Sequence, residues 1–343
     1  MKAYTLEPAQ VGDGDIGVAF AEEGFIAGKK VFRKGHRLTA EDFAQARALD
    51  APVHVIRIEA DDLHEDDAGR LLAQAVAGNG LELRGPAQSR YNLVATCKGV
   101  LKVDVAALDR INRIPGLAVF TLPDHLTVVP GRVCAGVKIT PICVPGAAIG
   151  DAEAIAAGTA VVRVAPFVPM RVGVVVTEGL SSSVRERFQG MVRKKLGWFG
   201  SEVLRFEEPA AEPHAVATAL TGLVRDGAQV ILLAGGNTVD PLDPALLALP
   251  EVGAEMIRFG APAHPGSMFW MAQLGAVPLI NLASCSMYSK ATVADLVLPW
   301  VLSGEQVGAE QLNALGHGGL LDRGMGWRFP AYEVDTVDES AEE

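Results

Sequence analysis

Hydroxyl and carboxylate side chains follow an apolar run at 171–176, where a predicted strand leads into a predicted helix. They are Thr177, Glu178, Ser181, Ser182 and Ser183. Peptide donors and the dipole at the N-terminus of a helix favour phosphate and other anions. The GxxxxGKS/T spacing of a P-loop and the GxGxxG fingerprint of a dinucleotide site are both absent. We expect an anion-binding loop, with an ordinary turn and serine helix caps as the structural alternative.

A glycine pair ends the next apolar run, at 229–234. Gly235 and Gly236 let a ligand approach the backbone closely, and peptide N–H groups in such a turn can form an anion-binding nest. The residues that follow offer compact donors and two carboxylates: Asn237, Thr238, Asp240 and Asp243. The carboxylates suit a magnesium ion or the donor edge of a heterocycle, and Asp243 equally suits a helix N-cap. A tight turn without a ligand would contain the same glycine pair.

A rigid turn, Pro265-Gly266-Ser267, follows the apolar run 256–259. We expect its serine to cap a helix over 267–274 and its peptide N–H groups to be available to an anion. His264 precedes the turn. A lone loop histidine is more often a polar surface residue than an acid–base group, and we expect that role for His264.

A fourth polar turn follows the apolar run 277–282. It contains Ser284, Cys285, Ser286 and Lys290. Small hydroxyl groups beside a lysine suit a phosphate or pyrophosphate, and a helix-capping loop would have the same composition. Four such turns are together more informative than each one alone, because a structural protein does not need a small polar turn after every core strand.

The elements that position these turns are predicted by the order of the apolar runs. Continuous β-branched runs are typical of parallel strands buried on both faces. We predict strands at 171–177, 202–206, 229–234, 255–259 and 277–282, and helices at 184–196, 213–226, 243–248, 267–274 and 291–302. Strands and helices that alternate in this way indicate a doubly wound, mostly parallel sheet, and ligands of such sheets bind beyond the carboxyl ends of the strands. All four turns should then lie at one edge.

The first half of the chain differs, with shorter strands interrupted by glycine. We expect an α+β or small β-barrel-like region over 1–150, a linker over 151–169, the α/β domain over 170–330 and an acidic disordered tail over 331–343. The acidic stretch 61–67 precedes a helix pattern over 68–77, and we interpret it as a solvated helix start, since carboxylates favour that end of the helix dipole.

Composition excludes several classes of protein. A length of 343 residues with 49% hydrophobic content suits two domains, and a formal net charge of -11 argues against nucleic acid as the main partner. No apolar run approaches the roughly 20 residues that cross a bilayer, and the N-terminus lacks an export-signal pattern, so we expect a cytoplasmic protein. Cys97, Cys134, Cys143 and Cys285 are scattered without a CxxC pair and should be small buried residues in a reducing compartment.

Residues 171 to about 303 resemble the molybdopterin-binding domain of molybdenum cofactor biosynthesis proteins. The resemblance depends on the segment 232–236 with Asp243 at the family's spacing, on the turn 265–267, and on the polar loop after 279–282. With the segments 90–93, 99–104 and 137–141, the whole chain is similar to the front half of bacterial fusions of a molybdopterin-binding region with a nucleotidyltransferase domain. We expect this chain to correspond to the molybdopterin-binding part alone, without that second domain.

The resemblance implies a three-layer α/β domain that holds the terminal phosphate of the pterin and, in catalytic members, an adenylate and magnesium. Asp243 corresponds to the family's acidic residue, whereas Asp240 and Glu178 have no secure counterpart. This chain has Asn237-Thr238 where the catalytic patterns carry a further small residue or glycine, and a shortened, basic segment at 183–187. Related domains form dimers or trimers, so a homo-oligomer is expected.

Three hypotheses for function follow. In the leading one, the chain binds molybdopterin or the finished molybdenum cofactor, with phosphate on the hydroxyl and glycine loops and Asp240 and Asp243 on pterin or metal. In the second, it is a molybdopterin adenylyltransferase or molybdotransferase that uses ATP, with Asp243 holding Mg²⁺. In the third, it is a non-catalytic partner of a separate nucleotidyltransferase or molybdoenzyme.

Overall fold

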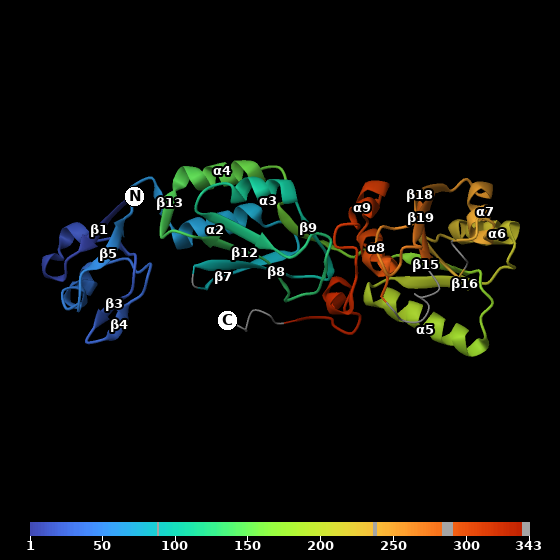
Figure 1. Cartoon of the computed structure of the whole chain (residues 1–343), viewed down its shortest axis with the longest axis horizontal. Helices are drawn as coiled ribbons and strands as arrows, with labels where there is room; N and C mark the ends of the chain where they lie inside the picture. Colours follow the sequence, from blue (N-terminus) through green and yellow to red (C-terminus); the bar gives the residue numbers. More distant parts are fainter. Residues whose placement is uncertain (88, 236–238, 283–290, 338–343) are drawn as a thin grey trace.

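The chain forms three packed units that follow one another along its long axis (Figure 1). The structure is a computed structural model, and it describes residues 1–337 except 88, 236–238 and 283–290. We call the three parts the N-terminal unit (residues 1–60), the middle unit (61–166) and the C-terminal domain (167–337). Each has its own buried apolar residues, and in the C-terminal domain these lie on both faces of one sheet.

The N-terminal unit is built from short antiparallel strands around a small aromatic core. Its elements are β1 (Lys2–Leu6), η1 (Pro8–Gln10), η2 (Asp13–Asp15), β2 (Ala19–Phe20), β3 (Gly24–Ile26), β4 (Lys29–Phe32), η3 (Ala40–Asp42), α1 (Phe43–Ala46) and β5 (Val53–Arg57). Phe20 and Phe32 stack with their ring centroids 4.6 Å apart. A capping box is present at Thr39, since the Thr39 amide donates to Asp42 Oδ2 at 2.8 Å.

The middle unit packs three helices against antiparallel strands. Its elements are β6 (Asp62–His64), α2 (Glu65–Val76), β7 (Leu81–Ala87), β8 (Arg90–Ala95), β9 (Gly99–Val103), α3 (Val105–Asn112), β10 (Leu117–Thr121), β11 (Thr127–Val128), β12 (Val133–Ile139), β13 (Cys143–Pro145), α4 (Gly146–Ala156) and β14 (Val162–Pro166). The strands form a sheet of order β10-β12-β8-β7, one of order β11-β9-β14 and the pair β13-β6. Within the stretch expected as a linker, α4 and β14 both contribute to this unit's core.

The acidic stretch before α2 differs from its expected environment. His64 is 6% exposed and Glu65 is 7% exposed, so the interpretation of 61–67 as a solvated helix start is wrong at these two positions. The physical reason is that the N-terminal unit packs against this end of α2, with the His64 Nε2 atom 3.1 Å from the Gly35 carbonyl oxygen. The carboxylates of the first turn still lie at the positive end of the helix dipole.

The C-terminal domain contains one mixed, mostly parallel sheet of order β16-β15-β17-β20-β19-β18. Its strands are β15 (Arg171–Val176), β16 (Glu202–Glu207), β17 (Val230–Ala234), β18 (Glu255–Phe259), β19 (Trp270–Leu274) and β20 (Val277–Leu282). Its helices are α5 (Ser182–Trp198), α6 (Pro213–Arg225), α7 (Pro244–Glu251), α8 (Val293–Leu302) and α9 (Ala309–Ala314), followed by the 3-10 helix η5 (Arg323–Arg328). The expected α/β class is confirmed.

Three layers result from the two buried faces of the sheet. Side chains of β15 and β17 alternate, so that Val174 and Leu232 pack with α5 and α8 while Val175 and Leu233 pack with α6 and α7. Because both faces of these strands are buried, successive residues must all be apolar, which explains the continuous apolar runs of the sequence. Figure 1 shows α5 on one side of the sheet and α6 with α7 on the other.

The helix predicted over 267–274 is wrong, because residues 270–274 form strand β19, antiparallel to β18 and β20. Successive side chains of this strand enter opposite layers: Met271 packs with α5 and α8, and Trp270 and Ala272 pack with α6 and α7. A short apolar run of this length fits a buried strand and a buried helix equally well, and here the tertiary pairing decides.

The described part of the expected acidic tail, residues 331–337, packs against the domain instead of extending into solvent. The Trp198 indole N–H donates to the Val334 carbonyl oxygen at 2.9 Å, and the Val337 amide donates to Pro130 O of the middle unit at 2.9 Å. Tyr332 and Val334 are partly buried against the core. Apolar side chains among the acidic residues therefore hold this segment in place.

A polar cluster joins the middle unit to the C-terminal domain. His125 lies 2.7 Å from Asp124 Oδ2 and 3.1 Å from Glu305 Oε1, and Lys102 pairs with the same Glu305. Burial acts to lower the pKa of His125, but its hydrogen bonds to Asp124 and Glu305 outweigh burial and raise the pKa to about 9. The imidazole is therefore positively charged at neutral pH.

Candidate functional site at the carboxyl edge of the sheet

The carboxyl ends of β15, β17 and β20 lie at the same level of the sheet. Val176 is paired with Ala234, and Ala234 is paired with Leu282, in parallel register. Each strand ends at one of these residues, so the carboxyl ends of the three strands lie side by side. The end of β18 is at the same edge, since Phe259 faces Trp270 and Met271 faces Ile280.

The first two loops are in direct contact. The Thr177 amide donates to the Ala234 carbonyl oxygen at 3.0 Å, and the Thr177 hydroxyl lies 3.5 Å from the same oxygen. Gly235 has φ +88, and a Cβ atom there would lie 2.6 Å from Glu178 Cβ and 2.9 Å from Glu178 N. Only glycine fits this conformation and this spacing without moving the neighbouring loop.

The start of α5 presents hydroxyl groups to solvent. Ser181 is the N-cap residue, with no hydrogen bond from its side chain to the helix, and Ser181, Ser182 and Ser183 are all exposed. The first N–H groups of a helix lack partners within the helix, and its dipole places partial positive charge there. Arg185, one turn further, is held 2.7 Å from Glu208. This geometry can accept an anion at the beginning of α5.

The two carboxylates of the second loop accept hydrogen bonds from nearby backbone amides. Asp243 is 6% exposed and caps α7, since its Oδ1 accepts the Ala245 amide at 2.9 Å. Asp240 Oδ1 accepts the Leu242 amide at 2.9 Å. The sequence left a helix cap and a ligand role open for Asp243, and the described contacts show the helix cap. The roles of both residues on pterin or magnesium stay predictions.

The third loop approaches the start of α8. A Cβ atom on Gly266 would lie 2.8 Å from the Val293 amide nitrogen, and the His264–Pro265 peptide is cis. Ser267 is exposed, and its carbonyl oxygen accepts the Ala261 amide at 3.0 Å. Ser267 does not cap a helix, because β19 follows it. His264 is exposed, and its backbone is hydrogen-bonded to Gly319 and Leu321.

Several predicted site residues lie outside the described residues. They are Gly236, Asn237, Thr238, Ser284, Cys285, Ser286 and Lys290. Their described neighbours are Gly235, which follows β17, and Leu282, which ends β20. Thr177, Glu178, Gly235 and Leu282 therefore lie at one edge of the sheet, as expected from parallel strands.

Asn281 is a polar residue at this edge that the residue pattern did not single out. It is 3% exposed, and its Oδ1 atom has no hydrogen-bond partner among the described residues. A buried carbonyl oxygen without a donor costs about 1–3 kcal/mol, so a donor is expected to reach it. The available signal was an asparagine inside an otherwise apolar strand.

A buried polar cluster lies between α5, the start of α8 and residues 331–337. Asp295 is 4% exposed and accepts hydrogen bonds from Lys195 at 2.6 Å, Tyr332 at 2.8 Å and the Thr292 amide at 3.0 Å. Burial and the neighbouring Asp295 raise the pKa of Tyr332 well above its ordinary value, so the phenol stays protonated and donates. The cluster connects the start of α8 to α5 and to residues 331–337.

The described residues contain no group of three or more His, Cys, Asp or Glu arranged to hold a metal ion. Among the helices of the described part of the chain, none is long and apolar enough to cross a membrane.

Comparisons with known proteins give structural likenesses only. No protein-family model and no curated protein matches the chain. It is similar to the molybdopterin biosynthesis MoeA protein of Pyrococcus horikosii, with 14% identity and a TM-score of 0.31 over 71% of this chain and 79% of the other. A molybdenum cofactor biosynthesis protein of Corynebacterium diphtheriae is 12% identical, with a TM-score of 0.27 over 43% and 99%. MogA is 20% identical, with a TM-score of 0.26 over 41% and 97%. At such scores the likenesses assign no role to any residue of this chain.

Proposed function

We propose that the chain binds molybdopterin or the finished molybdenum cofactor at the carboxyl edge of its C-terminal sheet, in cofactor biosynthesis, storage or delivery. The observation that carries this proposal is the register of β15, β17 and β20, whose last residues lie side by side. Ligands of open parallel sheets bind at this edge. The sequence motifs that resemble the molybdopterin-binding family begin at the same positions, so geometry and motif support one site.

The donor set fits a phosphorylated pterin. The open hydroxyl groups of Ser181 to Ser183 and the first peptide N–H groups of α5 suit the terminal phosphate. The close contact of Gly235 with Glu178 brings the glycine loop to the same place. Asn281 Oδ1 offers an acceptor that lacks a partner among the described residues, and the N–H donors of a pterin would satisfy it.

The described contacts of Asp243 add no support for an ATP-dependent role. The enzymatic alternatives need this carboxylate for Mg²⁺, whereas the contact that the structure describes is the cap of α7 by its Oδ1, and the side chain is buried. A cap residue of this kind contributes about 1 kcal/mol to stability through the helix. We therefore place the binding function first.

The proposal is tested by isothermal titration with molybdopterin released from a molybdoenzyme, using the wild type and Ser182→Asp. A carboxylate at the first residue of α5 stabilises the helix but repels phosphate, so we expect at least a tenfold weaker affinity without loss of folding. The control is Ala309→Asp, which adds the same charge at the exposed first residue of α9. Absence of binding to the wild type, or equal weakening in both variants, would refute the proposal.

A further inference from the structure

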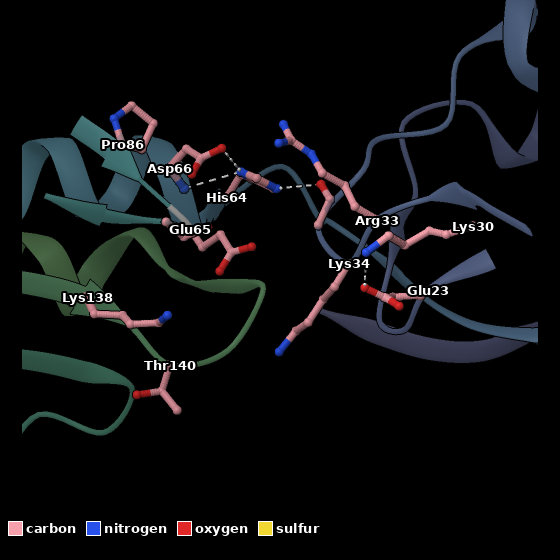
Figure 2. A pocket seen from close by; sticks show the side chains of 12 residues that line it. Glu23, Lys30, Arg33, Lys34, His64, Glu65, Asp66, Pro86, Lys138 and Thr140 are labelled. Atoms are coloured by element: carbon pink, nitrogen blue, oxygen red, sulfur yellow. Dashed lines mark hydrogen bonds and ion pairs between the residues drawn. The ribbon is translucent and has the colours of Figure 1, made fainter. Parts of the chain in front are cut away.

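A cavity of about 520 Å³ lies where the N-terminal unit meets the middle unit (Figure 2). From the N-terminal unit, Arg33 and Lys34 extend to opposite sides of His64. From the middle unit, Glu65 and Lys138 place both signs of charge on the same wall. Because these charged ends do not converge, the cavity identifies no class of ligand.

Polar groups do converge where residues 331–337 cross the C-terminal domain. We call these residues the C-terminal strap. Its backbone is held at two points, since the Trp198 indole N–H donates to the Val334 carbonyl oxygen at 2.9 Å and the Val337 amide donates to Pro130 O at 2.9 Å. The strap is therefore attached both to the end of α5 and to the middle unit.

Tyr332 is a strap residue whose side chain packs into the domain. Its ring centroid lies 5.7 Å from that of Trp198 and 5.8 Å from that of Phe199, edge-on in both cases. The Lys195 ammonium nitrogen lies 5.1 Å from the same centroid. The Tyr332 hydroxyl donates to Asp295 Oδ1 at 2.8 Å. Through this hydroxyl the strap reaches the first turn of α8.

Asp295 is a buried carboxylate with hydrogen-bond donors from three segments. Besides the Tyr332 hydroxyl, its Oδ1 accepts a hydrogen bond from Lys195 of α5 at 2.6 Å, and its Oδ2 accepts the Thr292 amide at 3.0 Å in the capping box of α8. A buried carboxylate that loses a donor is destabilised unless water replaces it. Without the phenol, the first turn of α8 would have to open to let water reach Asp295.

The first turn of α8 is in contact with the carboxyl edge of the sheet. A Cβ atom on Gly266 would lie 2.8 Å from the Val293 amide nitrogen, so the third loop packs closely against the first residue of α8. On the inner side, Lys195 and Asp295 line a cavity of about 30 Å³ together with Leu282, the last residue of β20. A displacement of this turn therefore moves the third loop or opens a gap beside β20.

We propose that Tyr332 is a positioning residue for the site at the carboxyl edge, acting through Asp295 on the first turn of α8 and on the third loop. The inference rests on the function proposed above, because it concerns the same site. The hydroxyl and not the ring has this role, since the ring packs against residues at the end of α5 whereas the hydroxyl reaches α8. Attachment of the strap and ligand affinity are therefore coupled.

Hydrogen exchange and isothermal titration of the full chain with Tyr332→Phe test the proposal, because phenylalanine keeps the ring and removes only the hydroxyl. We expect exchange at least tenfold faster at residues 292–297 and at the Phe269 amide, which donates to Gly266 O at 3.0 Å, with β15 and β17 unchanged. The affinity for molybdopterin should fall at least threefold, because a less populated binding-competent arrangement lowers the apparent affinity by that fraction. Both measurements are made where circular dichroism shows full folding, so that a loss of overall stability alone does not lower the affinity.

The matched control is Tyr4→Phe, which removes a phenol that donates to Asp15 Oδ1 at 2.7 Å in the N-terminal unit. It should leave the affinity and the exchange at 292–297 within about twofold of the wild type, because distant sites act independently. A second control lies in the strap itself. Asp335→Asn weakens an exposed pair with Lys98 and should also leave the start of α8 unchanged.

Three results for Tyr332→Phe would overturn the proposal. They are an unchanged affinity, unchanged exchange at 292–297 and Phe269, and exchange that becomes faster to the same degree throughout the C-terminal domain. The failure of the proposed function gives a different result, namely no binding of molybdopterin to the wild type. In that case the local exchange alone decides whether Tyr332 holds the first turn of α8 against the third loop.

Discussion

The carboxyl edge of the C-terminal sheet and the cavity between the first two units are assembled in different ways. At the edge, backbone pairing of neighbouring strands sets the position of each loop, as in the register of Val176, Ala234 and Leu282. At the cavity, side chains of two separately packed units meet, and a hydrogen bond between His64 Nε2 and the Gly35 carbonyl oxygen connects the units. A site made by one sheet shares the stability of its domain, whereas a site between units depends on a few polar contacts.

The largest expected effect is at Gly235. Gly235→Ala should lower the free energy of unfolding by about 2–4 kcal/mol, because the left-handed conformation and the contact with Glu178 are both unfavourable for a side chain. Urea unfolding measures it. The control is Gly253→Ala, at φ +70 with nothing within 4 Å of its added Cβ, which should cost only about 1–2 kcal/mol. Equal costs would show that the two loops are not tightly packed.

At the cavity, His64→Leu should cost about 1–2 kcal/mol, because the Gly35 carbonyl oxygen and the Asp66 amide both lose a buried partner. Hydrogen exchange should become faster at residues 33–36 and 64–66, while the strands of the C-terminal sheet stay protected. His54→Leu, at an exposed position of β5, is the control and should change stability by less than about 0.5 kcal/mol. Loosening throughout the chain would contradict the separation of the two regions.

The smallest effect concerns pH at the boundary between the middle unit and the C-terminal domain. The pKa of His125 is raised from 6.5 to about 9, so the stability it contributes is full below pH 6.5 and is lost as pH rises through about 9. Its side chain is 24% exposed, and solvent screening limits the loss to about 1 kcal/mol.

Urea unfolding should therefore show that the free energy of unfolding of the wild type decreases between pH 6.5 and pH 9.5. In His125→Gln this decrease should be smaller by about 1 kcal/mol. The control is His214→Gln, at an exposed histidine, and its free energy of unfolding should change with pH as in the wild type. Identical slopes in the wild type and His125→Gln would mean that Asp124 and Glu305 do not hold the charged imidazole.

Much of the C-terminal domain was predictable because its signals are local. The strands at 171–176 and 230–234 and the helices α5, α6 and α8 follow from continuous apolar runs and from helical periodicity. Residues 270–274 were misassigned, because Trp270 and Met271 are buried on opposite faces of a strand, a distinction that composition does not contain. Asp243 illustrates the same limit at the site, since one carboxylate can cap a helix or bind a metal, and only its distance to Ala245 shows the cap.

The sequence by itself determined the α/β class of the second half and the positions along the chain where polar turns interrupt apolar strands, because periodicity and glycine chemistry act over a few neighbouring residues. Only the tertiary structure decided that residues 331–337 pack against Trp198, that the Asn281 Oδ1 atom is buried without a described partner, and that Arg33, Lys34 and Glu65 line one cavity. These features join residues that are distant in sequence, and their contacts depend on how separately packed layers and units meet.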